Sequence, residues 1–262
     1  MKKFLTCGAM AAGAALLVSA MPIAASAATI VYGLAGLGIS TVGSGSSAIR
    51  FTTATVGGVN VRISAWSLSG GAGSSGGTVG KSSLQSYSGT GLGAISSGDS
   101  SSCCTHAIDN QTSRDFILFQ FDQSVKLLDG KFTPFAVGST KDTDFTVGRG
   151  STASPWTTQM DLTGTTASGL SSLLTGGYYH KDGPGSTTVQ ALNPSGGYGN
   201  LWIIGAKFTS TSTIDSFKFS QLRVATALPV PESSTWMMMI VGFGAAGTAL
   251  RRHKSAVRTA TV

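Results

Sequence analysis

The chain has 262 residues, which is enough for one domain, or two small ones, together with targeting segments. Only 11% of the residues are charged and 36 are glycine, which argues against a helical protein, whose surface needs Glu, Lys, Arg and Ala. The net charge of +7 lies mainly at the two ends, because residues 28–225 carry twelve Lys and Arg against ten Asp, a balance of +2. We therefore expect no nucleic-acid partner.

The first 27 residues have the three parts of a secretory signal peptide. Two lysines supply the positive charge, an apolar run follows, and Ala25 and Ala27 form the small-residue cleavage site. We predict export through the secretion translocon and cleavage by signal peptidase before Ala28. The alternative is an N-terminal membrane anchor, but the run is short and ends in small residues.

Short segments rich in β-branched and aromatic residues recur through residues 28–225, separated by Gly-rich turns. Residues 116–121 are almost continuously apolar, as in a strand buried on both faces. Val59, Val61 and Ile63 alternate with polar residues, as in a strand with one face toward water. We expect an all-β ectodomain, an antiparallel β-sandwich or jelly roll, with flexible surface segments at residues 70–80 and 89–102.

Cysteine and histidine give little sign of catalysis. Cys103 and Cys104 remain after signal removal, and a disulfide between them, two free thiols and an intermolecular bridge are all open. His106 and His180 are the histidines of the exported part, and no G-x-S-x-G elbow accompanies them. We interpret both as structural or surface residues, and expect no catalytic residue and no cofactor.

Aspartates gather at two places in the middle of the chain. Asp109, Asn110 and Asp115 flank a loop that enters a strand, so they suit either Asx-turn hydrogen bonds or a calcium ion, with Asp109 and Asp115 as the ligand candidates. Asp142 and Asp144 begin like a D-x-D calcium loop, but position twelve is an alanine where glutamate is required. We interpret Asp142 and Asp144 as edge-strand charges.

Aromatic residues raise the question of sugar binding. Tyr178, Tyr179 and Tyr198 lie in Gly-rich segments that we expect to be loops, and they could stack on sugar rings or pack down on the sheet. Trp202 lies in an apolar strand and is expected in the core.

The C-terminal part divides into a linker at residues 226–235, an uncharged apolar run at 236–250 and a basic tail at 251–262. As a helix, the fifteen apolar residues would cover roughly 22 Å, short of the ~30 Å hydrocarbon core, although we expect them to form a transmembrane-like helix. The basic residues after Leu250 would stay in the cytoplasm. A short anchor of this kind suits a sorting signal better than a permanent span.

The order of these residues resembles the PEP-CTERM sorting signal in its Trp-containing variant. The matching positions are Pro231, Glu232, Trp236, Arg251 and Arg252, while Ser233 and Met237 depart from the pattern. The resemblance implies recognition by an exosortase, a membrane-embedded cysteine transpeptidase, and removal of the tail near Pro231 and Glu232. It also implies a Gram-negative host that makes exopolysaccharide.

These features predict an exported, non-enzymatic protein of the cell surface or extracellular matrix. It would reside transiently in the inner membrane and then leave it. The alternative is a carbohydrate-binding module for the exopolysaccharide of the host.

Overall fold

The computed structural model describes residues 27–99, 106–209, 213–227 and 233–259. Ala25, Cys103, Cys104, Pro231 and Glu232 therefore lie outside the described residues, and the predictions made for them stay predictions. Ala27 and Ala28 are described, and both are exposed immediately before the first strand.

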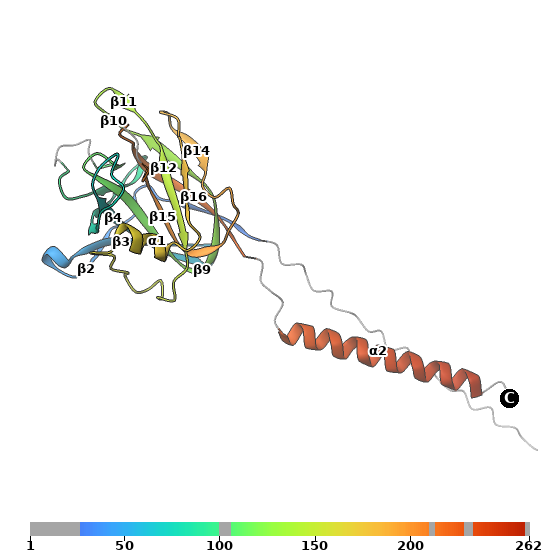
Figure 1. Cartoon of the computed structure of the whole chain (residues 1–262). Helices are drawn as coiled ribbons and strands as arrows, with labels where there is room; N and C mark the ends of the chain where they lie inside the picture. Colours follow the sequence, from blue (N-terminus) through green and yellow to red (C-terminus); the bar gives the residue numbers. More distant parts are fainter. Residues whose placement is uncertain (1–26, 100–105, 210–212, 228–232, 260–262) are drawn as a thin grey trace, which may run out of the picture.

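The described part of the chain is mostly β-strand, which confirms the all-β prediction (Figure 1). Every strand pair is antiparallel, and the main hydrogen-bonded path runs β13-β12-β15-β9-β16-β7-β6. The elements of the first half are β1 (Thr29–Gly33), β2 (Ser40–Val42), the 3-10 turn η1 (Gly45–Ser47), β3 (Ile49–Val56), β4 (Val59–Ser69), β5 (Val79–Lys81), β6 (Ser83–Tyr87), β7 (Gly91–Ile95), β8 (Ile108–Asp109) and β9 (Ser113–Pro134). The remaining elements are β10 (Ala136–Val137), β11 (Thr140–Lys141), β12 (Phe145–Gly150), α1 (Ala167–Leu173), β13 (Tyr178–Lys181), β14 (Thr188–Ala191), β15 (Gly199–Ala206), β16 (Ser216–Thr226) and α2 (Ser233–Thr259).

Strand β9 organises the sheet because it is 22 residues long and has different neighbours along its length. Its first half pairs with β4 and β15, so that Ile117 lies opposite Ala65 on one side and Ile204 on the other. Its second half pairs with β16 and β14. One strand thus joins two parts of the antiparallel sheet, and this sheet is curled (Figure 1).

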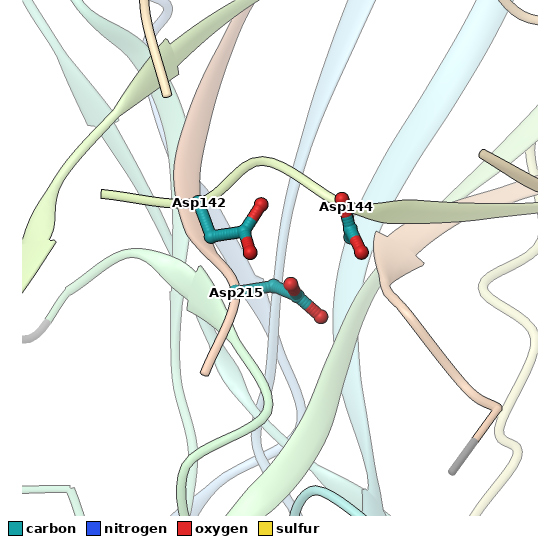
Figure 2. A group of neighbouring side chains, drawn as sticks. All are labelled: Asp142, Asp144 and Asp215. Atoms are coloured by element: carbon teal, nitrogen blue, oxygen red, sulfur yellow. The ribbon is translucent and has the colours of Figure 1, made fainter. Parts of the chain in front are cut away.

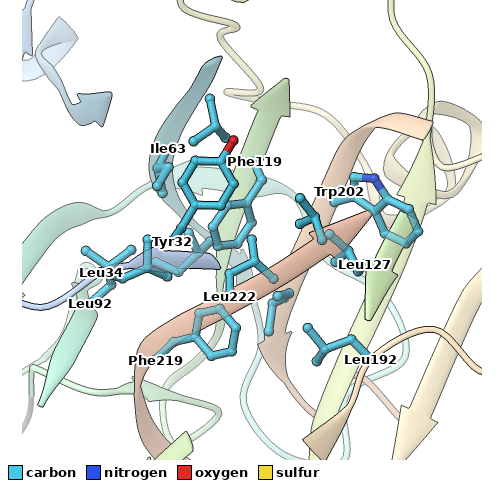
Figure 3. Close-up of a cluster of buried hydrophobic side chains, with 14 of the residues drawn as sticks. Tyr32, Leu34, Ile63, Leu92, Phe119, Leu127, Leu192, Trp202, Phe219 and Leu222 are labelled. Carbon is cyan, nitrogen blue, oxygen red and sulfur yellow. The ribbon is translucent and has the colours of Figure 1, made fainter. Parts of the chain in front are cut away.

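The main core fills the space enclosed by this curl (Figure 3). Phe132 lies among three other rings, with centroid distances of 4.5 Å to Phe145 and 5.0 Å to both Phe217 and Phe219. Tyr32 also lies in this core, and its hydroxyl donates to the carbonyl of Val59 at 2.9 Å. The buried aromatic surface is the chief source of stability in such a domain.

A second, smaller core lies on the opposite face of β4, β9 and β15, under α1. Phe116 and Leu118 point into it, whereas Ile117 and Phe119 point into the main core. This arrangement confirms that residues 116–121 form a strand buried on both faces. Thr166 is the N-cap of α1, and its hydroxyl accepts a hydrogen bond from the backbone N–H of Gly169.

The prediction that β4 turns one face toward water is wrong at Ser64, which is buried. Residues 151–166 cover this face. Arg62 donates to the carbonyls of Trp156 and Thr157, both at 2.8 Å, and Gln159 donates to the hydroxyl of Ser64 at 3.2 Å. Polar residues of β4 therefore bind a segment that covers this face of the strand. The alternation of apolar and polar residues in β4 does not by itself indicate that such a segment is present.

The expectation of flexible surface segments at 70–80 and 89–102 is also wrong in part. Residues 91–94 belong to β7 and are buried beside β16 and β6. Residues 69–76 are tied down by Arg114, a buried side chain of β9 that donates to several of their carbonyls. Glycine in these segments permits close backbone approach as well as turning.

Helix α2 extends beyond the predicted apolar run at both ends. Most of its large apolar side chains are exposed, for example Phe243 at 71%. None of the helices in the described part of the chain combines the length and the apolar character needed to cross a membrane, so the expected transmembrane-like helix at 236–250 is not supported.

Candidate functional site

Three carboxylates meet where the β11–β12 connection lies against the start of β16 (Figure 2). Asp142 and Asp144 flank Thr143 in this connection, and Asp215 directly precedes β16. The backbone N–H of Ser216 donates to the carbonyl of Asp142 at 3.0 Å, which holds the two segments together. One carboxylate oxygen from each aspartate lies within 4.8 Å of those of the other two. We call this group the Asp142–Asp144–Asp215 cluster.

Neighbouring groups fix Asp144 and Asp215 in place. Asp144 accepts from the backbone N–H of Gly183 through Oδ1 and from Lys207 Nζ through Oδ2, both at 2.9 Å. Asp215 Oδ2 accepts from Asn110 Nδ2 at 2.6 Å and from the backbone N–H of Lys207 at 3.3 Å. Asp215 also donates its backbone N–H to Asn110 Oδ1 at 2.9 Å. These bonds orient the carboxylates without satisfying every oxygen.

The electrostatics of the cluster are unfavourable for three ionised carboxylates. Burial raises the pKa of Asp215 to about 8, and repulsion from Asp144 and Asp142 adds to this shift. Burial and the neighbouring Asp144 likewise raise the pKa of Asp142. Burial alone would lower the pKa of Lys207, but Asp182 and Asp144 raise it above its ordinary value and keep the ammonium charged. The cluster therefore gathers more negative charge than its single ammonium neutralises.

The interpretation of Asp142 and Asp144 as edge-strand charges is wrong. Strand β12 pairs on both sides, with β13 and with β15, and Asp144 is buried. Asp215 was missed by sequence reasoning. It is a single aspartate before a strand, and only the long-range pairing of the sheet brings it to the other two carboxylates.

Asp109 and Asp115 lie outside the cluster. Asp109 Oδ1 accepts from the backbone N–H of Gln111 at 3.0 Å, as expected for an Asx turn. Asp115 is fully buried in β9, where Ser113 donates to its Oδ1 at 3.2 Å. Burial raises the pKa of Asp109 to about 7 and that of Asp115 well above its ordinary value. Asn110, between them in sequence, instead binds Asp215.

Two of the three tyrosines occupy positions different from those expected, whereas Tyr198 lies in the connection between β14 and β15, as predicted. Tyr178 and Tyr179 lie in β13, the strand at one end of the main hydrogen-bonded path, and not in a loop. Both line a pocket of about 190 Å³ together with Arg149, Asn193 and Trp202. Tyr198 does not line this pocket and is 39% exposed. Trp202 is buried, as predicted.

The two histidines bind hydroxyl groups. His106 Nδ1 lies 2.6 Å from the hydroxyl of Tyr87, and His180 Nδ1 lies 2.8 Å from the hydroxyl of Thr146. Burial lowers the pKa of His180, and the nearby charge of Lys207 lowers it further. In the part of the chain that the structure describes, neither imidazole is oriented by a carboxylate, an arrangement that a Ser-His-Asp site requires.

Comparison with known proteins gives no match, whether to a family model, a curated protein or a solved structure.

Proposed function

We propose that the chain is an exported, non-enzymatic protein of the cell surface or extracellular polymer matrix, sorted by an exosortase through its C-terminal segment. The partners are the secretion translocon and signal peptidase at the N-terminus and the exosortase at the C-terminus. The protein resides in the inner membrane only until the tail is removed near Pro231 and Glu232. The β domain between the two signals is the mature product, and we assign its curled sheet to the jelly-roll type of sandwich.

The exposed apolar surface of α2 is the observation that carries this proposal. Met238, Ile240 and Phe243 are each at least 70% exposed, and the exposed Arg251 follows the apolar run. A water-soluble domain rarely leaves so many large apolar side chains uncovered, and such patches mark contact with a membrane or another protein. An apolar helical segment with a basic end suits a signal read at the membrane surface.

The chemistry of the β domain supports a non-enzymatic role. The carboxylates of the cluster and the two histidines lie in separate hydrogen-bonded arrangements. A hydrolase would need a nucleophile, a base and an orienting group within hydrogen-bond reach of one another.

The sorting proposal is tested in the native host, with and without its exosortase gene. We expect Glu232→Ala and Trp236→Ala to reduce the extracellular protein and leave it in the membrane fraction, as loss of the exosortase would. Ser234→Ala is the matched control, since it lies between the motif residues and should be released normally. Normal release of the wild-type chain from cells lacking the exosortase, or equal release of all variants from cells that have it, would overturn the proposal.

A second candidate function is retention of exopolysaccharide by the pocket at β13. Two tyrosine rings with a neighbouring Arg149 and Asn193 are side chains able to stack on and hydrogen-bond a sugar. The test is electrophoretic retardation of the full chain in gels containing the exopolysaccharide of the host. Tyr178→Leu, which keeps apolar bulk but loses the ring, should abolish retardation, and Tyr198→Leu outside the pocket should not. Equal retardation of both variants would refute this function.

A further inference from the structure

The Asp142–Asp144–Asp215 cluster has the dimensions of a cation site. Its three oxygens lie within 4.8 Å of one another, so one ion placed among them would lie within roughly 2.8 Å of all three, close to the calcium–oxygen bond lengths of about 2.3–2.6 Å. The oxygens come from two segments far apart in the sequence, so their convergence is a property of the fold.

A second observation points to a missing partner. Asp215 is fully buried, and its Oδ1 has no hydrogen-bond partner, although Oδ2 of the same carboxylate has two. Figure 2 shows the carboxylate of Asp215 beside those of Asp142 and Asp144. An unsatisfied buried carboxylate oxygen is costly, and proteins normally supply it with a donor or a metal ion.

The charges around the cluster leave room for a divalent cation. When all three carboxyl groups are ionised, as binding of a cation requires, they carry three negative charges, and Lys207 supplies one positive charge. Lys207 is also shared with the exposed Asp182, so it neutralises the cluster only in part. The remaining charge of about two negative units matches one divalent ion, which would remove the repulsion between Asp142, Asp144 and Asp215.

The nature of the ligands selects the ion. Carboxylate oxygens favour hard cations, whereas zinc and copper sites normally include imidazole or thiolate ligands. Among hard cations, calcium accepts irregular sets of oxygens and longer bonds, while magnesium demands a near-ideal octahedron. We propose that Asp142, Asp144 and Asp215 bind one calcium ion that joins the β11–β12 connection to the start of β16.

Calcium binding at the cluster would be independent of how the tail is processed. The ion would stabilise the folded domain, because the three ligands come together only when β12 and β16 are in place. Asn110, which already binds both the backbone and the carboxylate of Asp215, would hold the ligand in position.

The test uses the full chain, purified in mild detergent and stripped with EGTA. Calcium binding is measured by titration calorimetry, and thermal unfolding by circular dichroism as calcium chloride is raised from ~10⁻⁵ to ~10⁻² M. This range brackets the dissociation constants of extracellular calcium modules, about 10⁻⁴–10⁻³ M. We expect one ion per chain and, at about one hundred times the dissociation constant, a rise in the unfolding midpoint of roughly 5–10 °C.

Two variants separate ion binding from a structural role. Asp142→Asn and Asp215→Asn should both lose the calcium-dependent rise in midpoint. Without calcium, Asp215→Asn should unfold at the same temperature as the wild type or higher, because the amide cannot ionise in this buried, negatively charged surrounding and can donate toward its neighbours. Asp161→Asn, whose carboxylate is exposed and pairs with Lys81 at 3.6 Å, is the matched control and should keep the full response.

Three results would overturn the proposal. The first is no calcium-dependent shift of the wild type up to ~10⁻² M. The second is a shift that persists in Asp142→Asn and Asp215→Asn. The third is a shift that survives in these variants but disappears in Asp109→Asn, which would assign the ion to the other aspartates of the β domain.

Discussion

Arg114 offers a sharp test of how the glycine-rich segment at residues 69–76 is held on the sheet. Its side chain is buried in β9, and its guanidinium faces backbone carbonyls. It donates to Gly70 at 3.0 Å, to Ser74 at 2.8 Å and to Ser69 at 3.2 Å, and also to Gly76. We expect Arg114→Ala to destabilise the domain strongly.

The expected magnitude follows from these bonds. A hydrogen bond from a charged donor contributes about 1.5–3 kcal/mol, but carbonyls that regain water after the substitution recover part of that loss. Ser69 and Gly76 are exposed, whereas Gly70 and Ser74 are half-buried, so the recovery is incomplete. We therefore expect a loss of about 3–5 kcal/mol in the free energy of unfolding, comparable with breaking a buried ionic contact.

Urea unfolding of the full chain in detergent, followed by tryptophan fluorescence, measures this loss. Arg114→Lys keeps the charge but has fewer donors, so its loss should be intermediate. Arg223→Ala is the matched control, because Arg223 lies in a strand but is half exposed and pairs with Asp129, and its loss should be below about 1 kcal/mol. Equal losses for Arg114→Ala and Arg223→Ala would refute the reasoning.

Three further predictions address pH and packing. The pKa of Asp215 is raised to about 8 and that of Asp109 to about 7, so the calcium-free folded state retains protons that the unfolded chain releases near 3.8. Stability should therefore fall as pH rises from about 4 to about 8, and a urea midpoint at pH 9 equal to or above that at pH 5 would contradict this. Phe132→Ala should cost about 3–5 kcal/mol in urea unfolding, and a loss below about 1 kcal/mol would argue against its central place in the core. A Cβ at Gly93 would lie 2.0 Å from the carbonyl oxygen of His106, whereas nothing lies within 4 Å at Gly33. Gly93→Ala should thus lower the thermal midpoint and Gly33→Ala should not.

The fold class could be predicted because its signals are local. Strand-forming residues between Gly-rich turns indicate an antiparallel β protein, and this indication does not require knowing which strands pair with each other. The nearly unbroken apolar run at 116–121 indicates burial on both faces, and the structure places its residues alternately in the two cores. The same pattern predicts that Trp202 lies in the core, and the structure confirms it.

Other features depend on what covers a strand, and the sequence of the strand does not contain that information. The alternation of β4 predicts that Ser64 faces solvent. Residues 151–166 nevertheless cover it, and Gln159 donates to its hydroxyl. Gly91 and Gly93 resemble turn residues, but they are small because the backbones of Phe219 and His106 approach them closely.

The carboxylate cluster was missed for a related reason. Asp142 and Asp144 are two of its three carboxylates, but a calcium loop of fixed spacing that begins at Asp142 requires a glutamate at position twelve, where this chain has an alanine. The third carboxylate, Asp215, comes from another segment, so no spacing rule within one loop can find it. Predicting such a site requires knowing that the β11–β12 connection lies against the start of β16.

The intact mass of the protein recovered from the extracellular fraction of its native host tests the sorting claim most directly. We predict a mature chain that begins at Ala28 and ends near Pro231, without the apolar segment at 236–250. An extracellular protein that still carried this segment, or a protein confined to the inner membrane with its tail intact, would contradict exosortase processing.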